Sequence, residues 1–374
     1  MDWKKIVKEY RRLKCPPGYY DPTTAPLGQA RYYDIVTERA TGKTTNVLLL
    51  GLCANKACGT VVQYIRQTDT MLAPKNASNL CANIISNGYV SKLTDGRYNT
   101  MIYKSRRWYY ASAIDGEITE TAPEACIVCL SIDNNEVYKS SYNAPQGDYI
   151  IFDEFCARRH IENEFVRFCD LLSTIIRTRN SGVVWMLGNM IDRYDYYFDE
   201  MEISDYMRYM GIGDNMLVTT SKGTPIYIEI FAPHAMTLKE RVNKAFFGFT
   251  NPGLNAITGE GWIIEPCPHI ERDAERRTLD STHHLLYEGY DLQLDICASP
   301  AHGLHICAHK CTTDNKPQAV YYTLDDMLDI RYRYKLGHTK IDRLIWTLYD
   351  RNLFFYGTNS DAAILRKYLD RAGC

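Results

Sequence analysis

The sequence lacks any long apolar run. The longest one, Val47 to Cys53, spans seven residues and contains a glycine, whereas a helix that crosses a bilayer needs about 20 apolar residues. The N-terminal segment, MDWKKIVKEYRRLK, is basic and has no apolar core of the kind that a secretory signal carries. We therefore expect no membrane association and a protein that works in a cytoplasm.

The chain also lacks an excess of charge of either sign. It has 43 Lys and Arg against 45 Asp and Glu, a net charge of −2, so bulk electrostatics do not draw it to nucleic acid. The charges are unevenly distributed, because residues 1–14 and 331–371 are basic whereas residues 192–205 are acidic. The nine basic residues of 331–371 suit phosphate contact, and a solvated helix face explains them nearly as well.

Cysteine is not used here as a disulfide framework. Thirteen cysteines in 374 residues are few for a long chain and odd in number, which favours free thiols. One cluster is suggestive of zinc: His302, His305, Cys307, His309 and Cys311. Its last four members alternate along one strand face, about 6.5–7 Å apart, and one strand is a poor source of a tetrahedral site. The sequence therefore argues against zinc at this place.

No internal repeat is present, and the first half of the chain reads as an α/β domain. Buried strands are predicted over residues 31–37, 60–66, 149–155 and 183–188, with helices over 43–58 and 162–177. Segments 31–37 and 60–66 read as a parallel pair joined by the helix between them. An Asp115-Gly116 turn predicts a hairpin between residues 108–114 and 118–131.

The second half reads as a smaller α+β domain. Strands are predicted over 285–294, 303–309 and 319–322, and helices over 323–334, 339–352 and 360–372. Between the two halves, residues 231–260 carry prolines and glycines typical of a linker or lid. The expected organisation is residues 1–230, a linker over 231–260, and a second domain over 261–374.

A phosphate-binding loop is indicated between the first strand and the first helix. Thr37-Glu38-Arg39-Ala40-Thr41-Gly42-Lys43-Thr44 has the terminal Gly-Lys-Thr of a P-loop, but Thr37 replaces its first glycine. In that position backbone amides and the helix N-terminus favour phosphate. The alternative is an ordinary helix N-terminus with a solvated Lys43.

Two adjacent carboxylates end the strand over 149–155. A nucleotide-bound Mg²⁺ needs a carboxylate, and hydrolysis needs a second acid to orient water. Asp153 and Glu154 supply both, since consecutive residues at a strand end point in different directions. The loop and the carboxylates together predict a nucleoside triphosphatase that uses Mg²⁺.

Three further residues are candidates for contacts with the γ-phosphate. Arg177 and Arg179 end the following helix, where a cation is also favoured by the helix dipole. Asn189 ends the strand VVWMLGN and can sense the γ-phosphate or simply form a turn. Spacing alone does not decide between these roles.

These motifs, in this order, resemble the DNA-packaging ATPases of phi29-like bacteriophages, compact relatives of the large terminases. The resemblance covers most of the chain. It rests on Tyr19-Tyr20-Asp21-Pro22, the loop from Glu38 to Thr44, Tyr64-Ile65-Arg66, Ile151-Phe152-Asp153-Glu154-Phe155 and Ile176-Arg177-Thr178-Arg179-Asn180. It implies a P-loop NTPase domain of the ASCE type with a mostly parallel sheet, linked to a smaller α+β RNase H-like domain that is a vestigial nuclease.

The resemblance also implies roles for individual residues. Thr44 and Asp153 would hold Mg²⁺, Glu154 would activate water, and Arg177 would be an arginine finger acting on a neighbouring subunit. Arg39 would act as a cis sensor, and Lys139 would face DNA in the pore of a ring. The nucleotide would be bound by Arg39, Ala40, Thr41, Gly42, Lys43, Thr44, Thr45 and Asn189, with Tyr20 and Pro22 framing the base.

The function implied by the resemblance is a ring-forming motor that drives double-stranded DNA into a procapsid with ATP. The partners that the resemblance implies are DNA, further copies of the chain in a homo-oligomeric ring expected to be a pentamer, the portal or connector, and a packaging RNA. It would work in the host cytoplasm, transiently at the portal vertex. Two alternatives stay open: a terminase-like enzyme whose second domain also cuts DNA, through acids such as Asp295, Asp325, Asp326 and Asp329, and a nucleotide-gated DNA clamp without turnover.

Overall fold

The structure is a computed structural model, and it describes most of the chain. The described residues are 1–142, 146–157, 161, 164–177, 179, 181–193, 195–231, 267–270, 278–287, 290–311, 319–321 and 340–371. The chain divides into two compact units, of which the first comprises Met1–Arg158 with Asn163–Ile264 and the second includes Glu265–Cys374. Almost all of the expected linker and the predicted helix over 323–334 lie outside the described residues, so the expected domain boundaries stay a prediction.

Helices of the first unit alternate with strands along the chain, as the sequence predicts. They are α1 (Trp3–Arg12), η1 (Pro22–Thr24), α2 (Lys43–Cys58), η2 (Asp69–Leu72), α3 (Pro74–Ala77), α4 (Ala82–Ser86), α5 (Tyr89–Leu93), α6 (Asn135–Ser141), α7 (Glu164–Ile176), α8 (Tyr196–Glu200) and α9 (Ser204–Tyr209).

One large sheet forms the centre of the first unit. Its strands are β1 (Tyr32–Thr37), β2 (Val62–Arg66), β3 (Thr100–Lys104), β4 (Arg107–Ile114), β5 (Glu117–Thr121), β6 (Ile127–Ser131), β7 (Tyr149–Asp153), β8 (Val183–Asn189), β9 (Asn215–Thr219) and β10 (Pro225–Phe231). Their order is β3-β4-β6-β2-β7-β8-β1-β10-β9, with β5 beside β4. The six strands from β6 to β10 in this order are parallel, and the outer strands are antiparallel. The predicted mostly parallel α/β sheet is therefore confirmed.

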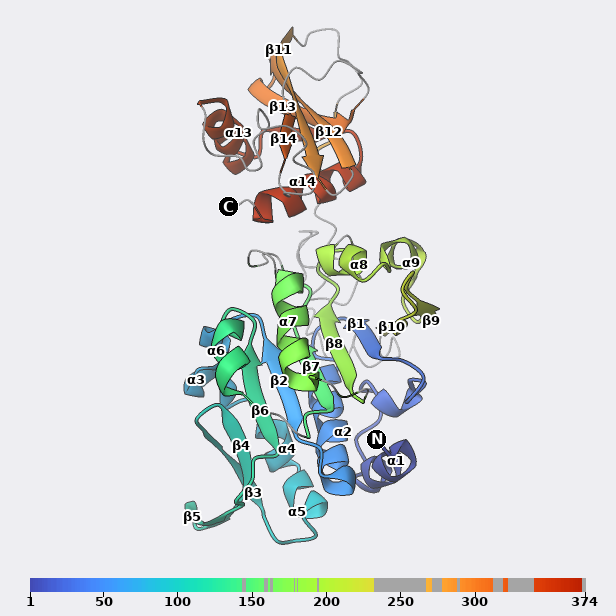
Figure 1. Ribbon diagram of the computed structural model, residues 1–374, viewed down its shortest axis with the longest axis vertical. Helices are drawn as coiled ribbons and strands as arrows, with labels where there is room; N and C mark the ends of the chain where they lie inside the picture. Colours follow the sequence, from blue (N-terminus) through green and yellow to red (C-terminus); the bar gives the residue numbers. More distant parts are fainter. Residues whose placement is uncertain are drawn as a thin grey trace, which may run out of the picture. The chain divides into compact units, whose positions relative to one another are not determined.

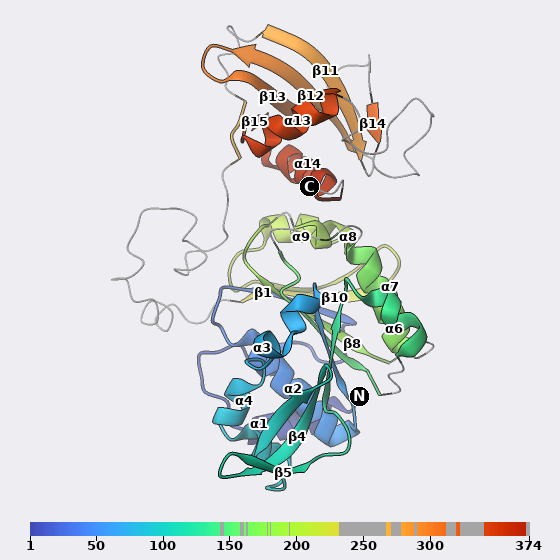
Figure 2. The ribbon, with the colours of Figure 1, turned by 90° about the vertical axis from the view of Figure 1, so that its left-hand side faces the viewer.

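Helices cover both faces of this sheet (Figures 1 and 2). On one face Tyr149 of β7 donates its hydroxyl to the carbonyl of Val47 in α2, at 2.9 Å. On the other face Phe152 of the same strand packs its ring 4.9 Å from that of Phe168 in α7. Successive strand residues thus serve opposite layers, which is why the buried strands read as continuous apolar runs rather than as alternating ones.

Helix α2 has the bounds that the sequence predicts. Gly59 ends it with a left-handed φ of +70° and donates its amide to the carbonyl of Asn55 at 2.9 Å, the usual glycine-based helix ending. Its buried residues run almost without a break from Asn46 to Ala54. Such a helix is apolar nearly all round because it lies in the core under α1 and against the sheet.

Three expectations about the strands are wrong. The strands over 31–37 and 60–66 are parallel but not neighbours, because β8 and β7 lie between them. The expected strand over 118–131 is two strands, since the proline at position 123 interrupts the ladder between Thr121 and Ile127. The expected strand over 285–294 contains a chain reversal, because Tyr287 pairs with Tyr290 in an antiparallel hairpin.

The second unit contains a smaller mixed sheet with helices packed on one face, which fits the expected α+β class (Figure 2). The described strands are β11 (Thr278–Tyr287), β12 (Tyr290–Ser299), β13 (Gly303–Lys310), β14 (Ala319–Tyr321) and β15 (Phe354–Tyr356), in the order β14-β11-β12-β13-β15. Helices α13 (Lys340–Asp350) and α14 (Asn359–Arg371) share an apolar core with Leu292, Leu294 and Ile306. Among the helices of the described residues, every one is too short or too polar to cross a bilayer.

Candidate functional site

The candidate site lies where three central strands of the large sheet end. In the register of the sheet Thr37 of β1 lies beside Asn189 of β8, and Asp153 of β7 lies beside Leu187 of β8. Because the strands are parallel, their carboxyl ends meet at one edge, which is the usual place for ligands in open α/β sheets. The topology therefore brings together the loop after β1, the two acids of β7 and Asn189.

The loop between β1 and α2 adopts left-handed backbone at two positions. Ala40 has a φ of +61° and Gly42 a φ of +76°, and a Cβ at Gly42 would lie 2.6 Å from the Tyr19 ring. Glycine is thus required at position 42 for both conformation and space.

Thr37, which replaces the first glycine of the P-loop pattern, closes the base of this loop. Its Oγ1 donates to the carbonyl oxygen of Glu38 at 2.7 Å and lies 2.8 Å from Oγ1 of Thr41. A side-chain bond thus ties the two ends of the loop together. The departure from the strict pattern is accommodated without losing the turn.

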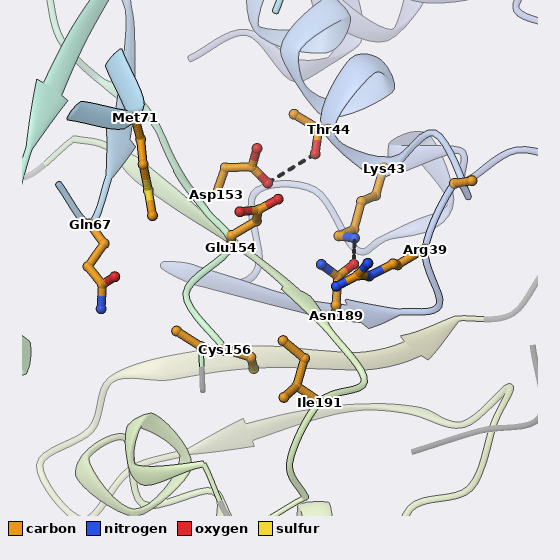
Figure 3. A pocket seen from close by; sticks show the side chains of 12 residues that line it. Arg39, Lys43, Thr44, Gln67, Met71, Asp153, Glu154, Cys156, Asn189 and Ile191 are labelled. Carbon is orange, nitrogen blue, oxygen red and sulfur yellow. Dashed lines mark hydrogen bonds between the residues drawn. The ribbon is translucent and has the colours of Figure 1, made fainter. Parts of the chain in front are cut away.

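Lys43 opens α2 and extends into the site (Figure 3). Its side chain is buried, and its Nζ donates to Oδ1 of Asn189 at 2.6 Å. Burial lowers the pKa of Lys43, while the nearby charges of Asp153 and Glu154 act in the opposite direction. A phosphate group entering the site would add negative charge beside this buried ammonium.

Thr44 and Asp153 form the second pair of the site. The Thr44 hydroxyl donates to Oδ1 of Asp153 at 3.0 Å, and Asp153 is 4% exposed. A hydroxyl and a carboxylate converging from a helix N-terminus and a strand end are the oxygen donors that Mg²⁺ prefers. The two residues therefore fit the magnesium site predicted from the sequence.

Glu154 follows directly on Asp153 but lies on the exposed side. Its φ is +60°, a conformation uncommon for a residue with a side chain, and its amide donates to the carbonyl of Leu187 at 2.7 Å. The backbone reversal directs the Glu154 carboxylate into the cavity while Asp153 stays beside Thr44 (Figure 3). Non-glycine backbone strain of this kind concentrates at functional sites.

Arg66 is a site residue to which sequence reasoning gave no role. At the end of β2, it donates from Nη1 to Oδ2 of Asp153 at 3.1 Å and from Nη2 to Oε2 of Glu154 at 2.5 Å. Although burial opposes it, the neighbouring Tyr64, Asp153 and Glu154 raise the pKa of Arg66, so the guanidinium stays charged. The hydroxyl of Tyr64 also donates to Oδ2 of Asp153, at 2.7 Å.

These side chains surround two adjoining cavities. The first, of about 440 Å³, is lined by Arg39, Ala40, Lys43, Thr44, Asp153, Glu154 and Asn189, together with Gln67, Met71, Cys156, Ala157 and Ile191. The second, of about 370 Å³, shares Thr44, Met71 and Asp153 with it and is also lined by Thr45, Tyr64 and Arg66. Such volumes are in the range of small-molecule sites.

Two residues expected to frame a nucleotide base are placed elsewhere. Tyr20 is fully buried, and its hydroxyl donates to Oε2 of Glu229 at 3.3 Å, while its amide donates to the carbonyl of Thr41 at 3.0 Å. Pro22 is buried in η1. Neither residue lines the two cavities. The described contacts show Tyr20 supporting the loop from behind, and a contact of either residue with the base stays a prediction.

The two candidate arginines lie at the opposite edge of the sheet from Lys43. Arg177 follows the end of α7, is exposed, and donates from Nη2 to the carbonyl of Tyr142 at 2.7 Å. Arg179 pairs with Asp148, the residue before β7, at 3.0 Å. The five residues of β7 thus separate both arginines from Asp153 and Glu154.

Lys139, the predicted DNA contact, lies on α6 and is engaged by two carboxylates. Its Nζ is 2.7 Å from Oε1 of Glu136 and 2.7 Å from Oδ2 of Asp170. The side chain is 40% exposed, so both pairs are open to solvent and are weak. A DNA phosphate could therefore displace either partner, and the role of Lys139 stays a prediction.

Comparison with known proteins places this fold. No family model matches the sequence, and no curated protein matches it.

Two solved structures match over nearly the full length of both chains. The phi-28 gp11 DNA packaging motor has a TM-score of 0.60 at 16% identity, covering 96% of this chain and 99% of that one. The bacteriophage phi-29 viral genome packaging motor assembly has a TM-score of 0.54 at 17% identity, covering 95% and 99%. The resemblance predicted from the sequence is thus confirmed at the level of the fold: along nearly its whole length, the chain has the fold of the phi29-type DNA-packaging motors.

Proposed function

We propose that this chain is the ATPase of a phage DNA-packaging motor. The observation that carries the proposal is the convergence of Lys43, Thr44, Asp153, Glu154 and Asn189 on one cavity at the carboxyl edge of a parallel sheet. These residues offer what ATP hydrolysis requires: a cation and an amide for phosphate oxygens, two oxygen ligands for magnesium, and a second carboxylate for water. The shared fold with packaging motors supports DNA translocation as the work done.

In this proposal Lys43 binds the β- and γ-phosphates, and its present partner Asn189 is left to contact the γ-phosphate. Thr44 and Asp153 hold Mg²⁺, which neutralises charge on the phosphates when it is bound. Glu154 accepts a proton from the attacking water. Arg66 donates one hydrogen bond to Glu154 and one to Asp153, so it positions both carboxylates for this step.

Ring formation is proposed on the placement of Arg177. Arg177 is exposed and lies at the edge of the sheet opposite Asp153 and Glu154. It is therefore available to the nucleotide of a second copy of the chain. Arg179 is less available, because Asp148 and the carbonyl of Ile175 both hold it. A homo-oligomeric ring, expected to be a pentamer, would place each Arg177 at the site of its neighbour. DNA in the ring pore, the portal, and a packaging RNA are the partners proposed with it.

The experiment that tests the proposed function is ATP turnover by the purified full chain with and without double-stranded DNA. We expect turnover that requires Mg²⁺ and rises when DNA is added. Lys43→Ala serves as the negative control, because it removes the charge on which phosphate binding depends. Turnover that is absent, or indifferent to DNA over a range of salt concentrations, would contradict a DNA motor.

A further inference from the structure

The small sheet of the second unit has one apolar face and one face rich in metal-binding side chains. On β12 the residues Leu292, Leu294 and Ile296 belong to the apolar core with α13 and α14. Because strand residues alternate, Asp295 and Cys297 lie on the other face. The face opposite the helices therefore collects cysteine, histidine and aspartate side chains from neighbouring strands.

Three of these side chains come together. In the antiparallel register Cys297 of β12 lies directly opposite His305 of β13, and Cys307 is the next residue of β13 on the same face. The two sulfur atoms and a ring nitrogen of His305 all lie within 4.8 Å of one another. The three residues are 2%, 3% and 1% exposed, in that order. They form a closed cluster of two thiols and an imidazole.

One ring nitrogen of His305, Nδ1, already makes a hydrogen bond to the backbone. Nδ1 lies 2.9 Å from the carbonyl oxygen of Gly303, and since a carbonyl can only accept, Nδ1 carries the proton. This tautomer leaves the lone pair on Nε2. Histidines that bind metals nearly always donate their other ring nitrogen in this way, often to a backbone carbonyl.

A second cluster on the same face has a simpler explanation. His284, Asp291 and Cys311 also lie within 4.8 Å of one another. However, Nδ1 of His284 is 3.4 Å from the Cys311 sulfur and 3.5 Å from an Asp291 oxygen. The contacts of His284 with the Cys311 thiol and the Asp291 carboxylate account for this proximity without a metal, and only one thiol is present in this cluster.

We propose that Cys297, His305 and Cys307 bind a Zn²⁺ ion. Two thiolates and an imidazole are a zinc-preferring donor set, and tetrahedral Zn–S and Zn–N bonds of about 2.3 and 2.0–2.1 Å place ligand atoms about 3.5–3.8 Å apart. Each separation needs to shorten by at most about 1.3 Å to reach this geometry. Binding releases the two thiol protons to solvent, and a water molecule completes the tetrahedron.

The sequence argument against zinc did not include Cys297, which lies on the neighbouring strand. That argument considered ligands from β13 alone, whereas Cys297 lies ten residues before Cys307 on the paired strand. The ion would join β12 to β13 on the face opposite α13 and α14. Its role is independent of the nucleotide site, which belongs to the first unit.

The test is metal analysis of the full chain purified without chelator, followed by Co²⁺ exchange. We expect one equivalent of zinc per chain, and for the Co²⁺ form the intense thiolate-to-cobalt absorption that requires cysteine ligands. Cys297→Ser and Cys307→Ser should each lose most of the metal and the absorption. Two matched controls, Cys311→Ser from the second cluster and the buried Cys126→Ser from the first unit, should retain both. Because the Co²⁺ spectrum is recorded on the parent chain, the test does not depend on the folding of a variant.

Three results would overturn the proposal. The first is a chain that carries no zinc and shows no cobalt–thiolate absorption. The second is loss of the metal in Cys311→Ser with retention in Cys297→Ser, which would assign it to the other cluster. The third is a mass two hydrogens lower with two fewer titratable thiols, absent in Cys297→Ser, which would show a disulfide between Cys297 and Cys307.

Discussion

Arg66 holds Glu154 by a charge-assisted hydrogen bond of 2.5 Å, and the same guanidinium reaches Asp153 at 3.1 Å. One side chain of β2 thus connects the proposed metal ligand to the proposed base. Asp153 is almost buried whereas the Glu154 side chain is 51% exposed, so Arg66 restrains a carboxylate that is otherwise free to move. This contact makes Arg66 a positioning residue for both acids.

Replacing Arg66 should impair turnover more than nucleotide binding. We expect Arg66→Gln to lower kcat by about tenfold or more, because misplacing a catalytic group by about 1 Å has effects of that size. Arg66→Lys keeps the charge but cannot bridge two carboxylates, so it should recover only part of the rate. Steady-state kinetics of ATP hydrolysis measure the split between kcat and KM. Arg107→Gln, on the exposed end of β4, is the matched control, and equal kinetics for all four proteins would contradict the assignment.

Mixing two inactive variants should reveal whether Arg177 acts on a neighbour. Arg177→Ala and Glu154→Gln should each lose about 10³-fold or more in DNA-stimulated turnover. Rings that contain both should regain part of it, because some interfaces then pair an intact Glu154 with an intact Arg177. Arg179→Ala should retain most of the activity, since that side chain is committed to Asp148.

The assignment to a neighbour fails if mixed assemblies form, as shown by tagged copurification, and no mixing ratio restores turnover. In that case Arg39, which is exposed and lines the cavity, becomes the better candidate.

The second unit should not cut DNA. Asp295, the described member of the acids considered for a nuclease, accepts hydrogen bonds from Thr282 at 2.8 Å and Gln293 at 2.9 Å, and His309 lies 3.2 Å away. Burial alone would raise the pKa of Asp295, but these hydrogen bonds lower it to about 2. A carboxylate held by three neighbours is poorly placed to share two metal ions. Asp325, Asp326 and Asp329 lie outside the described residues.

A plasmid nicking assay on the full chain with Mg²⁺ and with Mn²⁺ checks this expectation. We expect no nicks above those of a protein-free control. Nicking that disappears in Asp295→Asn would instead support the terminase-like alternative.

The buried carboxyl of Asp34 should make stability depend on pH. Asp34 lies at the centre of β1 and is fully buried, and among the described residues neither of its oxygens has a hydrogen-bond partner. Burial, and to a lesser degree the charge of Asp195, raise the pKa of Asp34 well above its ordinary value. A raised carboxyl pKa adds stability that is present below the unfolded value of about 3.9 and is lost as pH rises toward the folded pKa.

Above pH 4, the free energy of unfolding of the parent should therefore fall as the pH rises. In Asp34→Asn this fall should be smaller. The difference in unfolding free energy between Asp34→Asn and the parent should change by up to about 1.4 kcal/mol per pH unit. Urea unfolding at several pH values measures it, with the exposed turn variant Asp115→Asn as control. Parallel pH profiles for the parent and Asp34→Asn would show that Asp34 does not titrate as described.

The sequence predicts the individual helices and strands well, but it predicts poorly which strands lie side by side in the sheet. The bounds of α2 follow from Gly42, Lys43 and Gly59, which act on backbone within one turn. The order of the strands does not follow from such signals, because β8 and β7 separate β1 from β2 only through contacts distant in sequence. Arg66 was missed for that reason: its nearness to Asp153 depends on β2 lying beside β7. Cys297 and His305 are a second case, since only strand register makes them neighbours.

The central claim is that Glu154 performs hydrolysis of an ATP bound by Lys43. The measurement that tests it most directly is a paired assay of ATP binding and DNA-stimulated turnover for Glu154→Gln, with Glu117→Gln on the exposed strand β5 as control. The amide keeps the shape of the side chain and loses only the base, so the account predicts ATP bound as tightly as by the parent with turnover reduced to background. Near-parent turnover by Glu154→Gln would contradict the account.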